Sequence, residues 1–214
     1  MPAGKLAPLH VALLRGINVS GKNTLPMAEL ASIFVDAGCE DVRTYIQSGN
    51  VVFRAKSSVA RRVPEVVAGA IAEGFGYEVP VVCRSASEFR QVAKGHPFLS
   101  NAAELKALHV AFLMSKPSAA KVRSLDPNRS PSDELTVRGR EIYLHCPNGL
   151  GRSKLTNKYF DSKLGTTSTL RNWKTVLRVA AMLQFPPDEA GEGKCEGDDE
   201  DGKAGEDLLG GHGR

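Results

Sequence analysis

The chain has 214 residues, enough for one large domain or two small ones, and its 42% of hydrophobic residues is ordinary for a globular protein. No apolar run approaches the roughly 20 residues that span a bilayer, and residues 1–8 show no secretion signal, so we expect a cytoplasmic protein with no membrane contact. The four cysteines form no CxxC pair, which predicts reduced thiols, no metal site and no cofactor.

The charge is distributed unevenly along the chain. Residues 186–214 contain ten acidic and three basic residues, which leaves 25 basic and 14 acidic residues, or +11, in residues 1–185. The acidic segment is rich in glycine and poor in apolar residues, so we expect a disordered tail. It either promotes solubility or competes weakly for the cationic body. The body itself favours anionic partners.

Hydrophobic periodicity predicts seven elements in the first half. Pro64 should kink the second helix or delay its start, and Ser85 with Glu88 forms a capping box. The elements are a strand at 9–14, a helix from about Pro26 to Gly38, hairpin strands at 42–47 and 51–53, a helix at 58–74, a strand at 79–83 and a helix from Ser85 to about Gly95.

The second half repeats this order. The motif Leu-His-Val-Ala-Leu-Leu at 9–14 returns as Leu-His-Val-Ala-Phe-Leu at 108–113. Strands are predicted at 108–114, 134–138, 141–146 and 167–170, with helices from Ser118, at 153–164 and at 173–184. We therefore predict an α+β protein with two ferredoxin-like (split βαβ) units in tandem, at 1–97 and 106–185, each with an extra C-terminal helix.

The loop from Arg15 to Thr24 almost matches the phosphate-binding pattern GxxxxGK[ST]. Gly16, Gly21 and Lys22 fit, but Asn23 stands where a hydroxyl should bind magnesium, and the next helix begins several residues late. Nucleotide hydrolysis is therefore disfavoured. Anion binding without hydrolysis and a purely structural loop stay open.

A second glycine-rich loop, at 147–157, is expected to lead directly into a helix with Ser153 as its N-cap. Arg152 and Lys154 would then lie beside the positive end of the helix dipole, which makes this the better predicted anion site. An ordinary capped helix is the alternative.

Two further polar segments are candidates for ligand contact. Asn172 can cap the last helix, and Trp173 is either a core residue or a stacking platform. The segment 47–50 is either a tight turn or a source of hydrogen bonds to a ligand. We expect the loops after strands one and three to share one sheet edge and the hairpin turn to lie at the other, so one pocket would need the halves to dock by opposite edges.

These segments resemble the bacterial family called domain of unknown function 1697. The similarity rests on LLRGINVSGKN with PMAEL, RTYIQSGNVVF, YLHCPNGLGRSKLTN and TLRNWKTVL, and it spans residues 9–184. It implies a two-part α+β fold of ferredoxin-like units and a soluble cytoplasmic protein, with no established activity or cofactor. Pro64 and the acidic tail depart from the family pattern.

The leading hypothesis is a protein that binds a small phosphorylated or carboxylated ligand. No Ser-His-Asp or Cys-His set is evident, so catalytic residues stay unknown and enzymatic activity uncertain. The alternatives are binding of RNA or single-stranded nucleic acid, from the charge of the body, and a scaffold for a protein partner. The candidate ligand-binding residues are Arg15, Gly16, Asn18, Gly21, Lys22, Asn23, Gln47, Ser48, Asn50, Gly151, Arg152, Ser153, Lys154, Asn157, Arg171, Asn172 and Trp173.

Overall fold

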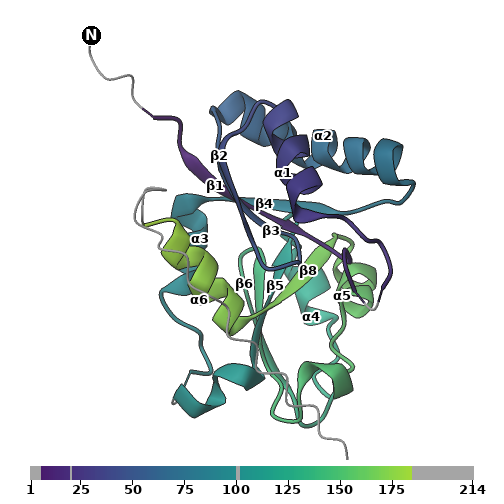
Figure 1. Cartoon of the computed structure of the whole chain (residues 1–214). Helices are drawn as coiled ribbons and strands as arrows, with labels where there is room; N and C mark the ends of the chain where they lie inside the picture. Colours follow the sequence, from purple (N-terminus) through teal and green to yellow (C-terminus); the bar gives the residue numbers. More distant parts are fainter. Residues whose placement is uncertain (1–5, 20, 100–101, 185–214) are drawn as a thin grey trace, which may run out of the picture.

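The protein consists of two four-stranded antiparallel sheets with helices packed around them (Figure 1). The computed structural model describes residues 6–19, 21–99 and 102–184, and it contains six α-helices in that part of the chain. The α+β class predicted from the sequence is confirmed. The predicted tail at 186–214 lies outside the described residues.

The first half forms the sheet with strand order β2-β3-β1-β4. Ser85 and Glu88 make the predicted capping box at the start of α3. The elements are β1 (Leu9–Leu14), α1 (Met27–Asp36), β2 (Glu40–Tyr45), β3 (Asn50–Arg54), α2 (Ser57–Phe75), β4 (Val81–Ser85) and α3 (Ala86–Ala93).

The second half forms the sheet with the corresponding strand order β6-β7-β5-β8. The sequence repeat falls on β1 and β5, which occupy the same position in the strand order of the two sheets. The elements are η1 (Ala102–Ala107), β5 (Leu108–Leu113), α4 (Ala119–Arg123), β6 (Glu134–Arg138), β7 (Glu141–His145), η2 (Leu150–Arg152), α5 (Asn157–Leu164), β8 (Ser168–Asn172) and α6 (Trp173–Met182).

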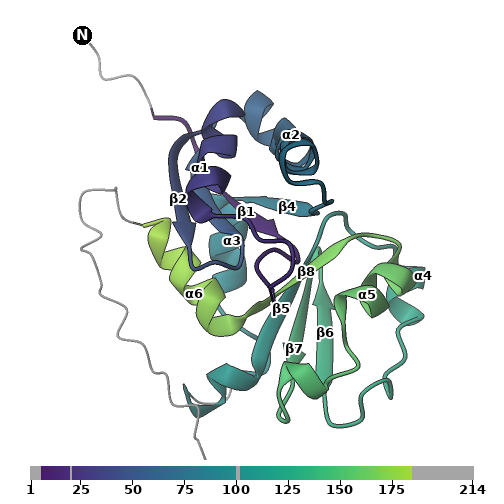
Figure 2. The ribbon, with the colours of Figure 1, turned by 45° about the vertical axis from the view of Figure 1, so that its right-hand side comes forward.

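Three hydrophobic cores cover both faces of both sheets. One lies between the first sheet and α1 with α2, and another between the second sheet and α4 with α5. The third lies between the two sheets and includes α3 and α6, which run side by side (Figures 1 and 2). In this central core Phe89 of α3 stacks on Phe112 of β5, with ring centroids 5.5 Å apart. The halves therefore share a core.

Two helix predictions need correction. The helix predicted to start at Ser153 starts at Asn157, because Thr156 rather than Ser153 accepts the capping hydrogen bond, from the Tyr159 N–H. Pro64 does not delay α2, which runs through it from Ser57. Burial of Val63, Val67 and Ile71 against the first sheet offsets the one backbone hydrogen bond that proline removes. The strands predicted at 79–83 and 167–170 end two residues later than expected.

The predicted arrangement of loops around the sheet is also wrong. Because β1 and β3 are antiparallel, the end of β1 lies beside the start of β3, and so beside the hairpin turn. The Leu14 N–H donates to the Gly49 carbonyl at 2.8 Å. The first loop and the hairpin turn therefore share one edge of the sheet, without any docking of opposite edges.

Candidate functional site

The loop after β1 is held in one shape by its own side chains. Gly16, Asn18, Gly21 and Asn23 have φ values of 76°, 53°, 72° and 51°, in the left-handed region that glycine and asparagine tolerate best. The Asn18 amide donates to the Leu25 carbonyl at 2.9 Å and accepts from the Leu25 N–H at 2.8 Å. The Asn23 amide donates to the Gly16 carbonyl at 2.9 Å. These two asparagines therefore fix the loop.

The β2–β3 hairpin turn packs against this loop and is itself strained. Asn18 also donates to the Gln47 carbonyl at 2.9 Å, which ties loop and turn together. Ile46 has φ 48°, which is costly for a β-branched residue, and half of its surface is exposed. Gln47 and Ser48 are also exposed. Unfavourable backbone geometry of this kind is concentrated at binding sites.

Arg171 of β8 is buried and crosses from the second half to this end of the first half. All five of its N–H donors have acceptors, and we name the arginine with these acceptors the Arg171 junction. The acceptors in the first half are the Asn50 side chain at 2.6 Å and the carbonyls of Leu14, Ser48 and Gly49 at 2.6, 3.1 and 3.2 Å. Those in the second half are the Thr169 hydroxyl and the Leu170 carbonyl, both at 2.8 Å.

No carboxylate pairs with Arg171 among the described residues. Burial lowers the pKa of Arg171 to about 10, which still leaves the guanidinium charged at neutral pH. The Asn50 amide is likewise fully used, since it donates to the Tyr45 carbonyl and the Ser48 hydroxyl. These two residues hold the halves together and have no donor left for a ligand.

Arg84 of β4 makes the reciprocal contact from the first half to the second. It donates to Glu141 Oε1 at 2.9 Å and to the carbonyls of Leu113 and Arg140 at 2.7 and 3.1 Å, and we name this set the Arg84 junction. Burial lowers the pKa of Arg84, while the Glu141 carboxylate opposes that shift. Sequence reasoning missed Arg84 because nothing in its neighbourhood marks it as an inter-half contact.

Arg15 is the part-exposed cation at this edge. Its Nη1 donates to Asp161 of α5 at 2.5 Å and to the Ser168 carbonyl at 3.0 Å. The Arg15 and Asp161 side chains are 30% and 26% exposed. Among the described residues, no acceptor is bound to Arg15 Nε or Nη2. The Ser168 N–H and hydroxyl both donate to Asp161 Oδ1 at 2.7 Å. Asn157 Oδ1 lies 3.1 Å from the same hydroxyl, so Asn157 also belongs to this cluster.

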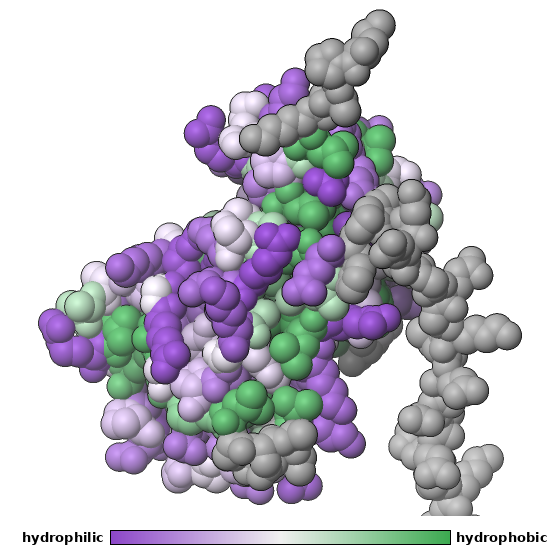
Figure 3. Space-filling model, turned by 90° about the vertical axis from the view of Figure 1, so that its left-hand side faces the viewer, coloured by the Kyte–Doolittle hydropathy of each residue, from purple (hydrophilic) through white to green (hydrophobic). Residues whose placement is uncertain are grey.

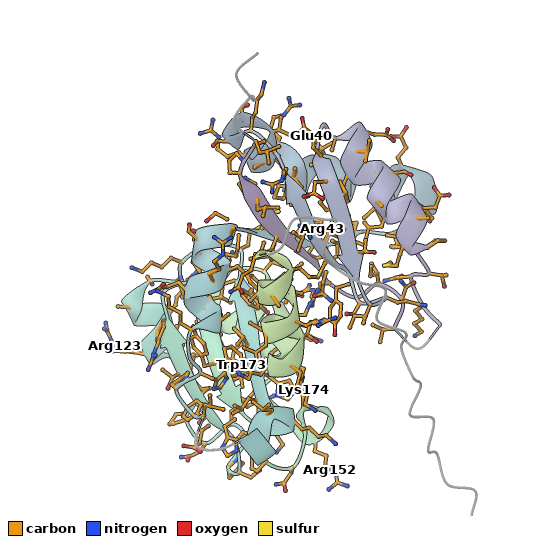
Figure 4. All side chains as sticks on the ribbon, turned by 60° about the vertical axis from the view of Figure 1, so that its left-hand side comes forward. Glu40, Arg43, Arg123, Arg152, Trp173 and Lys174 are labelled. Carbon is orange, nitrogen blue, oxygen red and sulfur yellow. The ribbon has the colours of Figure 1, made fainter. Side chains whose placement is uncertain are left out.

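The second glycine-rich loop lies elsewhere. Figure 4 shows Arg152 at the end of the second half that is farthest from the first half. Gly151 and Arg152 belong to η2, the Ser153 hydroxyl accepts from the Leu155 N–H at 3.0 Å, and the Lys154 N–H donates to the Ser130 hydroxyl. Because α5 begins only at Asn157, the two cations do not flank its N-terminus. No hydrogen bond or ion pair joins Arg152 or Lys154 to the first loop among the described residues.

The segment after β8 is placed in the core. Asn172 caps α6 by accepting from the Lys174 N–H at 2.9 Å, as predicted. Trp173 is 1% exposed and packs edge-on against His96, with ring centroids 5.0 Å apart (Figure 4). A buried indole offers no platform for stacking.

Sequence reasoning missed the partners that α5 and β8 supply to the first loop. Asp161 lies four residues after Asn157, on the same side of α5, and the run 166–169 consists of hydroxyl residues. This clustering of polar residues was the available signal. Their relation to Arg15 depends on how the halves pack.

The sheets offer no open face for nucleic acid. RNA-binding sheets expose aromatic side chains on one face, whereas here each face is covered by helices or by the other half. Tyr45, the last residue of β2, packs against the central core. In the described part of the chain, no helix is long and apolar enough to cross a membrane, and no three His, Cys, Asp or Glu residues are placed to hold a metal ion.

Comparisons with known proteins give a family and a fold. A family model described as a protein of unknown function, DUF1697, matches residues 9–143. No curated protein matches significantly. The solved structure of conserved bacterial protein SP0830 from Streptococcus pneumoniae is similar, with a TM-score of 0.65 and 24% identity, over 83% of this chain and 99% of that chain. That similarity concerns the fold alone.

Proposed function

The chain belongs to the DUF1697 family of proteins of unknown function, and we propose that it binds a small phosphorylated or carboxylated ligand at the edge formed by the first loop and the hairpin turn. The observation that carries this proposal is the concentration of left-handed residues in two adjoining loops beside a part-exposed guanidinium. Left-handed residues that alternate with residues of ordinary φ can turn backbone N–H groups towards an anion. In the first loop the Asn18 and Lys22 N–H groups donate internally, to the Asn23 and Val19 carbonyls, so the side chains carry most of the proposed binding. We name this edge the first-loop site, with Arg15, Lys22, Gln47 and Ser48 as its ligand-contacting residues.

The roles within the first-loop site follow from which donors are free. Arg15 has two unused nitrogens and can bind an oxyanion through both, while the exposed Lys22 amine supplies a second charge. Gln47 and Ser48 are exposed on the strained turn. Asn18, Asn23 and Asn50 hold the backbone of the loop and the turn in place through their side-chain hydrogen bonds. Asn157 positions Ser168, whose carbonyl contacts Arg15.

The experiment is a thermal-shift and calorimetry screen with inorganic phosphate, pyrophosphate, citrate and a short RNA at low salt. A ligand at 100 times its Kd stabilises the folded state by about 2.7 kcal/mol, which in a chain of this size is roughly a 5–11 °C rise in Tm. We expect one of the small anions to give this rise, and Lys22→Ala to weaken its binding roughly 1.4- to 5-fold.

The matched control is Lys116→Ala, because Lys116 is exposed in the loop after β5, the counterpart of the first loop. That loop contains no glycine and no left-handed residue. Equal weakening by the two lysine variants would contradict a specific site, and binding of RNA alone would replace the proposed function with nucleic-acid binding.

We further propose that each half is a ferredoxin-like unit, with boundaries at 1–97 and 106–185. The strand orders β2-β3-β1-β4 and β6-β7-β5-β8, each produced by a βαββαβ chain, support this assignment. A cytoplasmic location stays a prediction.

A further inference from the structure

The free edges of the two sheets are not equally protected. Unpaired sheet edges invite another strand, and proteins normally block them. Arg84 and Arg171 each donate to a carbonyl of their own edge strand, that of Cys83 in β4 and of Leu170 in β8. β2 carries a register shift between Glu40 and Arg43. β6 has none of these devices and pairs with β7 in continuous register.

The backbone groups of β6 that face outwards can be identified from the ladder. The Leu113 N–H donates to the Arg140 carbonyl, so alternate residues of β7 starting from position 140 bond to β5. The residues between them, such as Tyr143, bond to β6 instead. Their partners there are Thr136 and the residues two positions before and after it. The N–H and C=O groups of Leu135 and Val137 therefore point to the open side. No hydrogen bond to them is formed within the described part of the chain.

A groove of about 590 Å³ runs along this open side. Figure 2 shows β6 at the rim of the second sheet. The floor of the groove includes the apolar side chains of Val122, Leu125 and Leu155. The charged residues that line it are all acidic, namely Asp126, Asp133 and Glu134.

The acidic lining stands out on a body with a net charge of +11. Among the ion pairs of the described residues, neither Asp126 nor Asp133 has a basic partner, and Glu134 pairs only with His145, at 3.1 Å. Figure 3 shows one side of the molecule, on which hydrophilic and hydrophobic residues are interspersed. The groove therefore combines free strand hydrogen bonds, an apolar floor and unpaired negative charge.

We propose that the β6 edge binds an extended segment of a partner protein in which basic and apolar residues alternate. Such a segment adds a fifth strand to the second sheet by bonding to Leu135 and Val137. Side chains of an added strand point alternately to the two faces of the sheet, so apolar ones meet the floor of the groove and basic ones the opposite face, which carries Glu134. Asp126 and Asp133 add negative charge beside the floor. This inference does not depend on the first-loop site, which lies at the junction of the two halves.

The test uses the full-length protein and a capped, fluorescent peptide of sequence Lys-Val-Lys-Val-Lys-Val, with amide exchange followed by NMR. We expect saturable binding that weakens with salt. The decisive readout is residue-specific, because bound peptide should slow exchange of the Leu135 and Val137 amides. The Thr136 amide is already bonded to β7 and should not change.

Two variants separate the backbone and charge contributions. Val137→Pro deletes an outward N–H at a position where an edge strand tolerates proline, and should weaken binding roughly 2- to 13-fold. Asp126→Asn with Asp133→Asn keeps the side-chain size and should weaken binding roughly 1.4- to 5-fold per charge. Asp36→Asn, on the exposed side of α1, is the control and should change nothing.

Three results would overturn the proposal. They are unchanged exchange at Leu135 and Val137 with saturating peptide, equal binding of the acidic analogue Glu-Val-Glu-Val-Glu-Val, and self-association of the protein that Val137→Pro abolishes. The last result would mean that a second copy of the chain covers β6.

Discussion

The Arg84 and Arg171 junctions occupy corresponding places in the two halves, but their guanidinium groups are satisfied by different partners. Arg84 lies opposite Val11 in the β1–β4 ladder, and Arg171 lies opposite Val110 in the β5–β8 ladder. Each guanidinium reaches the last residues of the first strand in the other half. Arg84 meets a carboxylate, Glu141, whereas Arg171 meets a neutral amide, Asn50.

The difference shows what a buried guanidinium requires. Isolated burial of a charge is costly, and either an ion pair or a complete set of hydrogen bonds offsets that cost. Arg84 uses both, and Arg171 uses hydrogen bonds alone. The Arg171 junction is therefore the one whose stability depends most strictly on the planar geometry of arginine.

The largest expected effect comes from replacing Arg171. Arg171→Met leaves buried carbonyls of the first half without a donor and should lower the free energy of unfolding by about 3–5 kcal/mol. Arg171→Lys keeps the charge but cannot bond in five directions, so it should recover less than half of the loss. Urea denaturation measures both. Full recovery with lysine would show that charge, rather than geometry, holds this junction.

A glycine substitution tests how tightly the first half closes around Arg171. Gly49 has φ 73°, and an added Cβ would lie 2.7 Å from Leu14 Cβ. Gly49→Ala should therefore cost about 2–5 kcal/mol, from the left-handed backbone and the overlap together. The control is Gly139→Ala in the other hairpin, where the nearest atom is 3.7 Å away and only the backbone cost of about 1–2 kcal/mol applies. Similar losses in the two variants would contradict tight closure at Gly49.

Glu141→Gln makes the Arg84 junction chemically similar to the Arg171 junction. The amide keeps an acceptor for Arg84 but removes the negative charge, so we expect a loss of about 1–2 kcal/mol in the free energy of unfolding. Raising the salt concentration should reduce this difference in the free energy of unfolding only slightly, because the Arg84–Glu141 pair is mostly buried and therefore weakly screened. An unchanged free energy of unfolding would show that hydrogen bonds without an ion pair are enough to stabilise the buried guanidinium at both junctions.

Acid should destabilise the protein through histidines near the central core. Burial lowers the pKa of His96 and of His109 below the ordinary 6.5, so the unfolded chain binds more protons than the folded one just below that pH. The free energy of unfolding should therefore fall as pH drops from 6.5 towards the folded-state pKa values, by up to about 1.4 kcal/mol per pH unit for each proton. Urea midpoints between pH 7.5 and 5 measure this slope, which His96→Gln should reduce.

Most of the secondary structure and the duplication followed from local sequence. Strand alternation, the capping box at Ser85, the Ser118 and Asn172 caps and the motif repeated in β1 and β5 depend on near neighbours, which periodicity reveals. The start of α5 was misplaced because Ser153 and Thr156 are both competent caps, and only packing decides between them.

The sequence by itself determined the two-part α+β order and the cationic body, and it marked the glycine-rich first loop as polar, because each depends on residue type and near spacing. The tertiary structure alone decided which polar residues meet. It joined Arg15 to Asp161 and Arg171 to Asn50 across more than 100 residues, buried Trp173, and placed Arg152 at the far end. Such contacts depend on how two sheets pack around a shared core, and that packing is set by side-chain shape over the whole interface rather than by any local pattern.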